Sequence, residues 1–138
     1  MEKYFNWFCI VVGSFGGFLV KILGGWDLLL KTVVALVVLD YITGIIKAIY
    51  TKQLSSTVGF KGLLKKIMVF IMIATAYLLQ HLFGDTIPLR EVVITFFVAN
   101  EGLSLLENAA ILIPVPEKIK DVLLQIREKG VDNNGSSD

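Results

Sequence analysis

Five polar side chains recur along a hydrophobic stretch in the last third of the chain. They are Asn100, Glu101, Ser104, Glu107 and Asn108. At about 100° per residue in an α-helix, all five fall within a sector roughly 120° wide. A carboxylate near the centre of a bilayer costs about 2.5–3.5 kcal/mol, so in a membrane these groups need partners, protonation or water. The stripe therefore predicts a wall that faces water, polar contacts between helices, or a proton-coupled site.

A second polar strip has the helical spacing i, i+3, i+4, i+7. It consists of Asp40, Thr43, Gly44 and Lys47. Residues at this spacing share one face of a helix. The two strips are expected in the same half of a membrane, where Asp40 can meet Glu107 and Asn108 within one chain or across subunits. Either they line a water-filled space, or they form a packing contact that Gly44 allows to be close.

No familiar catalytic or metal-binding motif accompanies these residues. The sequence has no glycine-rich phosphate loop followed by Lys and Ser or Thr, no HExxH and no CxxC. Cys9 is the only cysteine and His81 the only histidine, which argues against an intrachain disulfide and against a zinc site. We therefore expect no catalytic residue, no metal, no cofactor and no enzymatic activity.

The composition indicates a chain that folds in lipid. Over 138 residues it is 55 % hydrophobic and 18 % charged, with a mean hydropathy of +0.73. Soluble domains are about 45–50 % apolar and about a quarter charged. The net charge of +1 offers no basic field that would attract a nucleic acid. The expected fold class is all-α, an integral membrane protein built from helical hairpins.

Hydrophobic stretches of about 20 residues, the length that crosses a bilayer, place the helices. We expect membrane helices at about 4–23, 28–50, 65–83 and 89–113, and a short amphipathic surface helix at 116–129. The first stretch is either a full span or a helix lying on the membrane surface, which gives four or three transmembrane helices. Residues 1–129 are expected to form one membrane domain. A disordered tail is expected at 130–138, where apolar residues are few.

A run of lysines indicates how the helices are oriented. Five lysines and no acid lie between Lys47 and Lys66. Cytoplasmic loops of membrane proteins are enriched in Lys and Arg. We therefore expect a cytoplasmic basic loop and a cytoplasmic carboxy terminus. The loop carries its basic side chains at Lys52, Lys61, Lys65 and Lys66.

Glycines on the first helix indicate a surface for close helix packing. Gly13 and Gly17 have the GxxxG spacing, and Gly24 is expected on the same face. Small residues let helix backbones approach closely within a membrane. Together with Gly44, these positions are candidates for helix packing and self-association, although glycine is also frequent in membrane helices for other reasons.

Four motifs in order resemble those of a known family. The first is the run LDYITG from Leu39 to Gly44, and the second is the group Ser55, Ser56, Gly59, Gly62, Leu63 and Lys66. The third is the run NEGLSLLEN from Asn100 to Asn108, and the fourth is PVP from Pro114 to Pro116. Over about residues 36–126 the chain resembles the toxin-secretion and phage-lysis holin family, which includes clostridial toxin-export holins. One departure is Leu112, where the family often has glycine.

The resemblance implies a function in the bacterial cytoplasmic membrane. Members of the family are small multi-pass proteins from phages or prophages that oligomerise and make lesions. An endolysin or a toxin leaves the cytoplasm through the lesion, with or without direct binding. The implied partners are other copies of the chain and the lipid bilayer. By motif match the family's positions correspond to Asp40, Gly44, Glu101, Ser104 and Asn108, none with a catalytic role.

Two other functions fit the same residues. Asp40, Glu101 and Glu107 are also what a small ion or proton-coupled transporter would place in its membrane helices. Such a protein would show saturable transport without bulk leakage. The basic loop and the charged tail would instead serve a membrane anchor that holds a partner protein. An anchor would tolerate apolar replacement of the polar stripes, but not loss of Lys61, Lys65 and Lys66.

Overall fold

The computed structural model describes residues 1–132, and the side chains of residues 1–129. The predicted tail at 130–138 lies outside these described residues, except that its first three residues continue the last helix. The described chain folds into five helices and no strand, so the predicted all-α fold class is confirmed. The helices are α1 (Glu2–Ile22), α2 (Leu28–Tyr50), α3 (Ser56–Leu82), α4 (Leu89–Ala109) and α5 (Glu117–Asp132).

Side-chain caps fix where two of these helices begin. The Asp27 carboxylate accepts a hydrogen bond from the backbone N–H of Leu30 at 2.9 Å, which satisfies a free donor at the start of α2. Ser55 caps α3 in the same way, and its Oγ accepts from the N–H of Val58 at 3.2 Å. Helix α3 therefore begins at Ser56, and the predicted start near residue 65 is wrong.

Two glycines that precede the predicted start at residue 65 lie inside α3. Gly59 and Gly62 face the ring of Tyr41 on α2, and a Cβ on Gly62 would lie 3.5 Å from that ring. The Tyr41 hydroxyl also donates a hydrogen bond to the Gly59 carbonyl at 3.3 Å. These glycines allow α2 and α3 to approach closely, which is a packing role rather than a turn.

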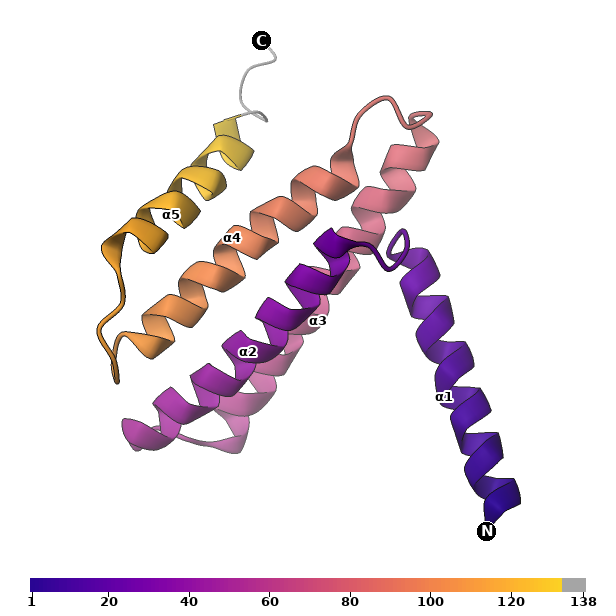
Figure 1. Ribbon diagram of the computed structural model, residues 1–138, viewed down its shortest axis with the longest axis horizontal. Helices are drawn as coiled ribbons and strands as arrows, with labels where there is room; N and C mark the ends of the chain where they lie inside the picture. The colour runs from indigo at the N-terminus through magenta and orange to yellow at the C-terminus, as the bar shows by residue number, and fades with distance from the viewer. Residues whose placement is uncertain (133–138) are drawn as a thin grey trace.

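Helices α2, α3 and α4 form a bundle in which α2 and α4 run in the same direction and α3 runs opposite to them (Figure 1). Helix α4 is the central element, because it packs against α2, α3 and α5. Its helical part ends at Ala109 rather than at the predicted residue 113. The buried core is apolar and comes from all three helices of the bundle: Leu30, Val33, Val37, Val69, Ile73 and Ile94.

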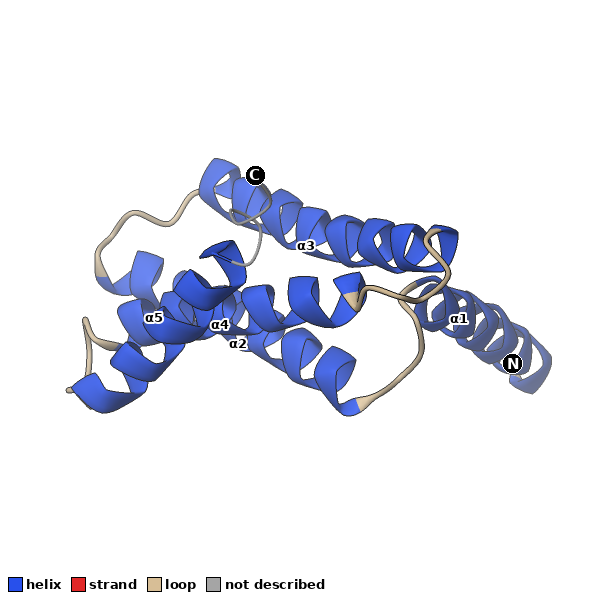
Figure 2. Cartoon of the chain, turned by 90° about the horizontal axis from the view of Figure 1, so that it is seen from above, coloured by secondary structure: helices blue, strands red, loops and turns tan. Residues whose placement is uncertain are grey.

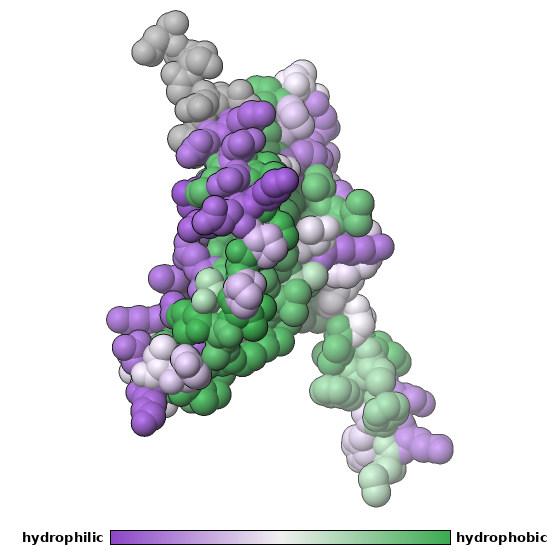
Figure 3. Space-filling view, turned by 60° about the vertical axis from the view of Figure 1, so that its left-hand side comes forward, coloured by the Kyte–Doolittle hydropathy of each residue, from purple (hydrophilic) through white to green (hydrophobic). Residues whose placement is uncertain are grey.

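Helix α1 leaves the bundle at an angle and contacts it only near its end (Figures 1 and 2). None of its residues is buried. Hydrophobic side chains cover most of this arm (Figure 3), and Phe8, Val12 and Phe15 are each more than half exposed. A surface of this kind is stable only against lipid or another apolar partner.

Three of the described helices, α1, α2 and α3, are long and apolar enough to cross a membrane. The fourth predicted span, α4, falls outside this set. It carries charged residues at Arg90, Glu91, Glu101 and Glu107. The described chain thus holds three candidate spans, and the charged helix α4 packs against two of them, α2 and α3.

The glycines of α1 occupy two different settings. No atom of the described chain comes within 4 Å of a Cβ placed on Gly13 or Gly17, so both lie free on the helix surface. Gly24 does not share their face, contrary to the prediction. It lies in the turn after α1 with a φ of +89°, where a side chain would collide with Arg90 and Tyr77.

Candidate functional site

The polar strips of α2 and α4 face each other inside the bundle. The Asn108 side-chain amide donates to the Asp40 carboxylate at 3.0 Å and to the Thr43 hydroxyl at 3.2 Å. It also lies 3.3 Å from the Asp40 carbonyl oxygen. Gly44 leaves room for this contact, since a Cβ there would lie 3.7 Å from the Asn108 nitrogen. Of the two arrangements that the sequence allowed for Asp40 and Asn108, the structure shows contact within one chain.

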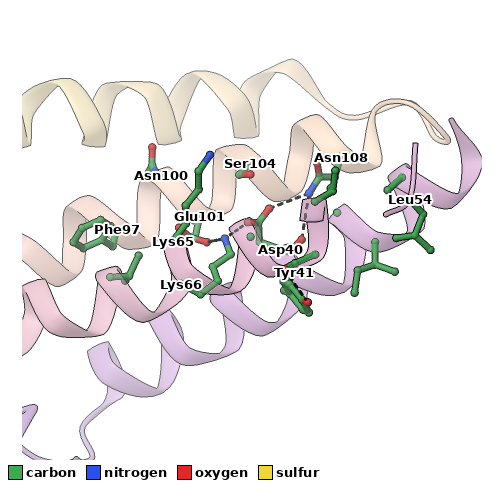
Figure 4. A pocket seen from close by; sticks show the side chains of 17 residues that line it. Asp40, Tyr41, Leu54, Lys65, Lys66, Phe97, Asn100, Glu101, Ser104 and Asn108 are labelled. Carbon is green, nitrogen blue, oxygen red and sulfur yellow. Dashed lines mark hydrogen bonds and ion pairs between the residues drawn. The ribbon is translucent and has the colours of Figure 1, made fainter. Parts of the chain in front are cut away.

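Lys66 connects both strips to α3. Its ammonium group forms ion pairs with the carboxylates of Asp40 and Glu101 (Figure 4). The three side chains are 14 %, 7 % and 5 % exposed, so the pairs are largely shielded from solvent. The prediction that Lys66 belongs to the cytoplasmic basic loop is therefore wrong. The other three lysines of that prediction, Lys52, Lys61 and Lys65, are exposed.

The ionic network, defined here as Lys66, Asp40, Glu101 and Asn108, joins three helices. Taking a charge out of water is costly, and a buried ion pair is sustained only when good geometry and further hydrogen bonds compensate each group. Here one ammonium group serves two carboxylates, and the Asn108 amide completes the coordination of Asp40. Loss of Lys66 leaves two buried carboxylates without a counter-charge. The network thus holds α2, α3 and α4 in one register.

A pocket of about 480 Å³ opens beside the network, between α2, α3 and α4 (Figure 4). Its polar lining includes Asn100 and Ser104 as well as the members of the network. Its apolar lining includes Leu54, Val58 and Phe97. The predicted stripe on α4 is thus mostly turned toward this pocket.

Two residues of the predicted strips lie apart from the network within the described chain. Glu107 is exposed on α4, and Lys47 is half-buried near the end of α2. Neither lines the pocket. Among the described residues, no group of three His, Cys, Asp or Glu side chains is placed to hold a metal ion.

A further buried charged residue, Arg90, was not identified from the sequence. Its side chain is 3 % exposed, and it lies in the first turn of α4, about three helical turns before Glu101. Its Nε donates to the Leu23 carbonyl at 2.5 Å, and its Nη2 donates to the Gly25 carbonyl at 3.1 Å. Its Nη1 donates to the Asp27 carboxylate at 2.7 Å. We call this group, Arg90 with the turn from Leu23 to Asp27, the arginine clamp.

The arginine clamp fixes the turn from which α1 departs. The Arg90 backbone N–H is itself held by the Gln80 side-chain oxygen at 2.9 Å, so α3 also takes part. The sequence carried one signal of a distant partner. Arg90 is the only basic residue of α4, and the only acid near it in that helix is the adjacent Glu91. Asp27, the partner of Arg90, lies 63 residues away, however, and no local pattern connects them.

The clamp predicts an effect of acid on stability. The hydrogen bonds from Arg90 lower the pKa of Asp27, which lies before α2 and outside the span, against a smaller opposing effect of burial. Because the folded pKa is the lower one, this carboxylate stabilises the fold fully above its unfolded pKa of about 3.9. That contribution is lost as the pH falls through the folded value. We expect the thermal midpoint in detergent to fall between about pH 4 and pH 2 more steeply for the wild type than for Asp27→Asn. Parallel curves for the two proteins would contradict this assignment.

Comparison with known proteins gives a family for this architecture. A family model described as the Bacteriophage holin family matches residues 17–128. The chain belongs to this holin family. The matched segment contains all of α2, α3 and α4, and it includes both the ionic network and the arginine clamp. The resemblance stated from the sequence motifs is thus confirmed.

Relatives of this holin-family chain come from bacteria and from a phage. An "Uncharacterized 14.9 kDa protein in nagH 3'region" of Clostridium perfringens is 37 % identical over 131 residues, covering 94 % of this chain and 99 % of that protein. An uncharacterized protein of Listeria innocua is 38 % identical over 126 residues, covering 91 % of this chain and 90 % of that protein. A "Probable holin" of Bacillus phage phi105 is 34 % identical over 95 residues, covering 68 % of this chain and 70 % of that protein. No solved structure matches the chain.

Proposed function

We propose that this protein self-assembles in the bacterial cytoplasmic membrane and opens lesions that release an endolysin or a toxin. Membership of the holin family carries the proposal. The three long apolar helices support it, because they suit a multi-pass membrane protein. The phage relative whose name is "Probable holin" supports it further. The work done in this role is assembly and opening, and it requires no catalytic group.

The structure changes which residues are assigned to which part of this function. Asp40, Glu101 and Asn108 contact Lys66 or one another inside one chain. We therefore assign them to polar contacts between helices, one of the three roles that the polar stripe predicted. The pore wall must then be formed by other side chains, or by these after the network opens. Gly13 and Gly17 remain candidates for contact between subunits, because their surface is free in the single chain.

The exposed lysines around the turn between α2 and α3 support a direction for the chain in the membrane. Lys52 lies in that turn, and Lys61 and Lys65 lie in the first half of α3. We assign this end of the bundle to the cytoplasm, since basic residues concentrate on that side. The arginine clamp and the start of α2 then lie toward the outer face.

Co-expression with a cell-wall hydrolase tests the proposed function. The hydrolase is cytoplasmic and lacks its own export signal, and optical density and release of a cytoplasmic enzyme are followed after induction. We expect abrupt lysis when both proteins are present, and no lysis with the hydrolase alone. Cells that stay intact with both proteins present would contradict a lesion large enough for a protein.

One observation favours a second candidate function, a small proton-coupled transporter. Two buried carboxylates share one ammonium group beside a pocket, which leaves a surplus negative charge that a proton or a cation would balance. Intramembrane acids with this environment are typical of proton relays. In the co-expression assay this function predicts ion flux in intact cells, and loss of that flux in Glu101→Gln.

A further inference from the structure

The depth of α5 follows from its contacts with α4. Helix α4 runs beside α2 from the arginine clamp at Asp27 to the Asn108 contact at Gly44. That stretch of α2 covers about 25 Å at 1.5 Å per residue, most of the roughly 30 Å hydrocarbon core. If α2 spans the membrane, α4 therefore lies at membrane depth along with it.

Helix α5 packs along the stretch of α4 that lies at membrane depth, and not beyond the end of α4 (Figures 1 and 2). Leu123 sits on Gly102, where an added Cβ would lie 3.1 Å from Leu123 Cδ1 and 3.5 Å from its Cδ2. Gly102 is buried, and it lies between Ile94 in the core and Asn108 in the network. The middle of α5 is thus level with the middle of the bundle.

The side of α5 that faces away from α4 is charged. At about 100° per residue, Leu123, Ile126 and Arg127 point toward one side, and these residues are half-buried. The opposite sector, about 120° wide, centres near Gln125. We call it the charged face of α5, and its exposed members are Glu117, Lys118, Asp121, Gln125, Glu128 and Lys129. A band of hydrophilic side chains marks this side of the molecule, next to hydrophobic surface (Figure 3).

Lipid cannot cover the charged face at this depth. Ionised side chains in the hydrocarbon region are strongly disfavoured, and those found there face water or other protein groups. The acids and lysines of the charged face make no ion pair or side-chain hydrogen bond in the described part of the chain. Water at membrane depth is therefore required wherever α5 stays docked on α4.

We propose that α5 remains docked on α4 in the assembled lesion and that the charged face of α5 lines the aqueous lumen. This inference rests on the proposed lesion-forming function. Each subunit would present α5 to water, and α1 and the apolar side of α3 to lipid. The mixture of acids and lysines in the face suits passage of protein cargo of either charge. The residues that line the lumen are then on α5, and the α2–α4 strips remain structural.

A reversible lock between α4 and α5 tests whether docking persists. Gly102→Cys and Leu123→Cys are introduced together into a Cys9→Ser parent, and the purified full chain is placed in liposomes that contain an entrapped enzyme. The lock is closed with an oxidant, verified by mobility on a gel, and reopened with a reductant. We expect the oxidised protein to release at least half as much enzyme as the reduced protein. If oxidation abolishes release and reduction restores it, α5 must leave α4 to open the lesion, and the proposal fails.

A second pair of substitutions tests whether the charged face meets water. Asp121→Leu with Gln125→Leu makes the centre of that face apolar without touching the Leu123 contact. We expect at least a tenfold loss of enzyme release. The matched control is Glu2→Leu with Gln53→Leu, an exposed acid on α1 and an exposed amide in the turn after α2, which should keep release within about twofold of the parent. Full release by the α5 variant would overturn the lumen assignment.

The parent protein separates this inference from the proposed function. Failure of the Cys9→Ser parent, and of the wild type, to release any enzyme would contradict lesion formation itself. Release by the parent with failure in either test above would contradict only the role of α5.

Discussion

Replacing Lys66 with methionine is expected to destabilise the protein by roughly 3–5 kcal/mol, the usual cost of removing one partner from a buried ion pair. The methionine fills similar space but leaves two carboxylates without a counter-charge. These belong to Asp40 and Glu101, residues that are 6 % and 4 % exposed. Unfolding in detergent micelles, followed by circular dichroism against added denaturant, measures the loss. We also expect less protein to accumulate in the membrane and hydrolase-dependent lysis to be lost.

The neighbouring lysine provides the matched control for this prediction. Lys65 belongs to the same helix but is exposed, so Lys65→Met should change the free energy of unfolding by less than about 0.5 kcal/mol. Neutralising the acids as well, with Asp40→Asn and Glu101→Gln beside Lys66→Met, should recover much of the stability, because no buried charge then lacks a partner. Equal effects of the Lys65 and Lys66 substitutions would contradict the network as described.

The sequence predicted most helices because their signals are local. The span at 28–50 coincides with α2, whose start follows from the cap at Asp27 and whose length follows from an uninterrupted apolar run. The start of α3 was mispredicted because the uncharged apolar run begins only after Lys66, and Gly59 and Gly62 do not favour a helix. Their actual role depends on the ring of Tyr41 from another helix, which no local pattern shows.

Residue spacing predicted Asp40 and Asn108, because each lies on the polar face of its own helix. The contact of Lys66 with the acids was not predicted, because a lysine that follows other lysines resembles a loop residue. Lys65 and Lys66 differ by about 100° around the helix, so one meets solvent and the other meets the acids of α2 and α4. Likewise, the apolar stripe of α5 predicted an amphipathic helix correctly, but a stripe fits a lipid surface and a neighbouring helix equally well.

Polar contacts hold the bundle at two levels, and an apolar core separates them. The ionic network reaches from the middle of the bundle to the end of α4, and the arginine clamp lies at the start of α4. Leu30, Ile73 and Ile94 are fully buried in the core. This order fixes the register of α2, α3 and α4 twice, since a shift of one turn would break both sets of contacts. The bundle therefore behaves as one unit, and α1, which touches it only near its end, is the part able to change position.

The orientation of α1 depends on the arginine clamp more than on packing. No residue of α1 is buried, so nothing along its length holds it in place. The turn that joins it to α2 contains two glycines with positive φ, Gly24 and Gly25, which permit many conformations once they are released. The Arg90 guanidinium holds this turn through the carbonyls of Leu23 and Gly25.

Arg90→Leu is therefore expected to free α1 from the bundle. Spin labels on the native Cys9 in α1 and on an introduced Thr75→Cys in α3 report the distance between the two helices. We expect the distance distribution to become at least twofold broader, because the turn loses its hydrogen-bond donors. The unfolding free energy should also fall by about 2–3 kcal/mol, since hydrogen bonds to charged groups contribute about 1.5–3 kcal/mol. Arg90→Lys should lie between the wild type and the leucine variant, because an ammonium group cannot donate in the fork that reaches both carbonyls and Asp27.

The other arginine of the chain supplies the control. Arg127 lies on α5, away from the turn, so Arg127→Leu should leave the distance between the labelled helices unchanged. If Arg90→Leu kept the narrow distribution of the wild type, the turn itself would fix α1, and the buried arginine would serve only to close the outer end of the bundle. If it broadened the distribution and also abolished lysis, the angle of α1 would be a requirement of assembly.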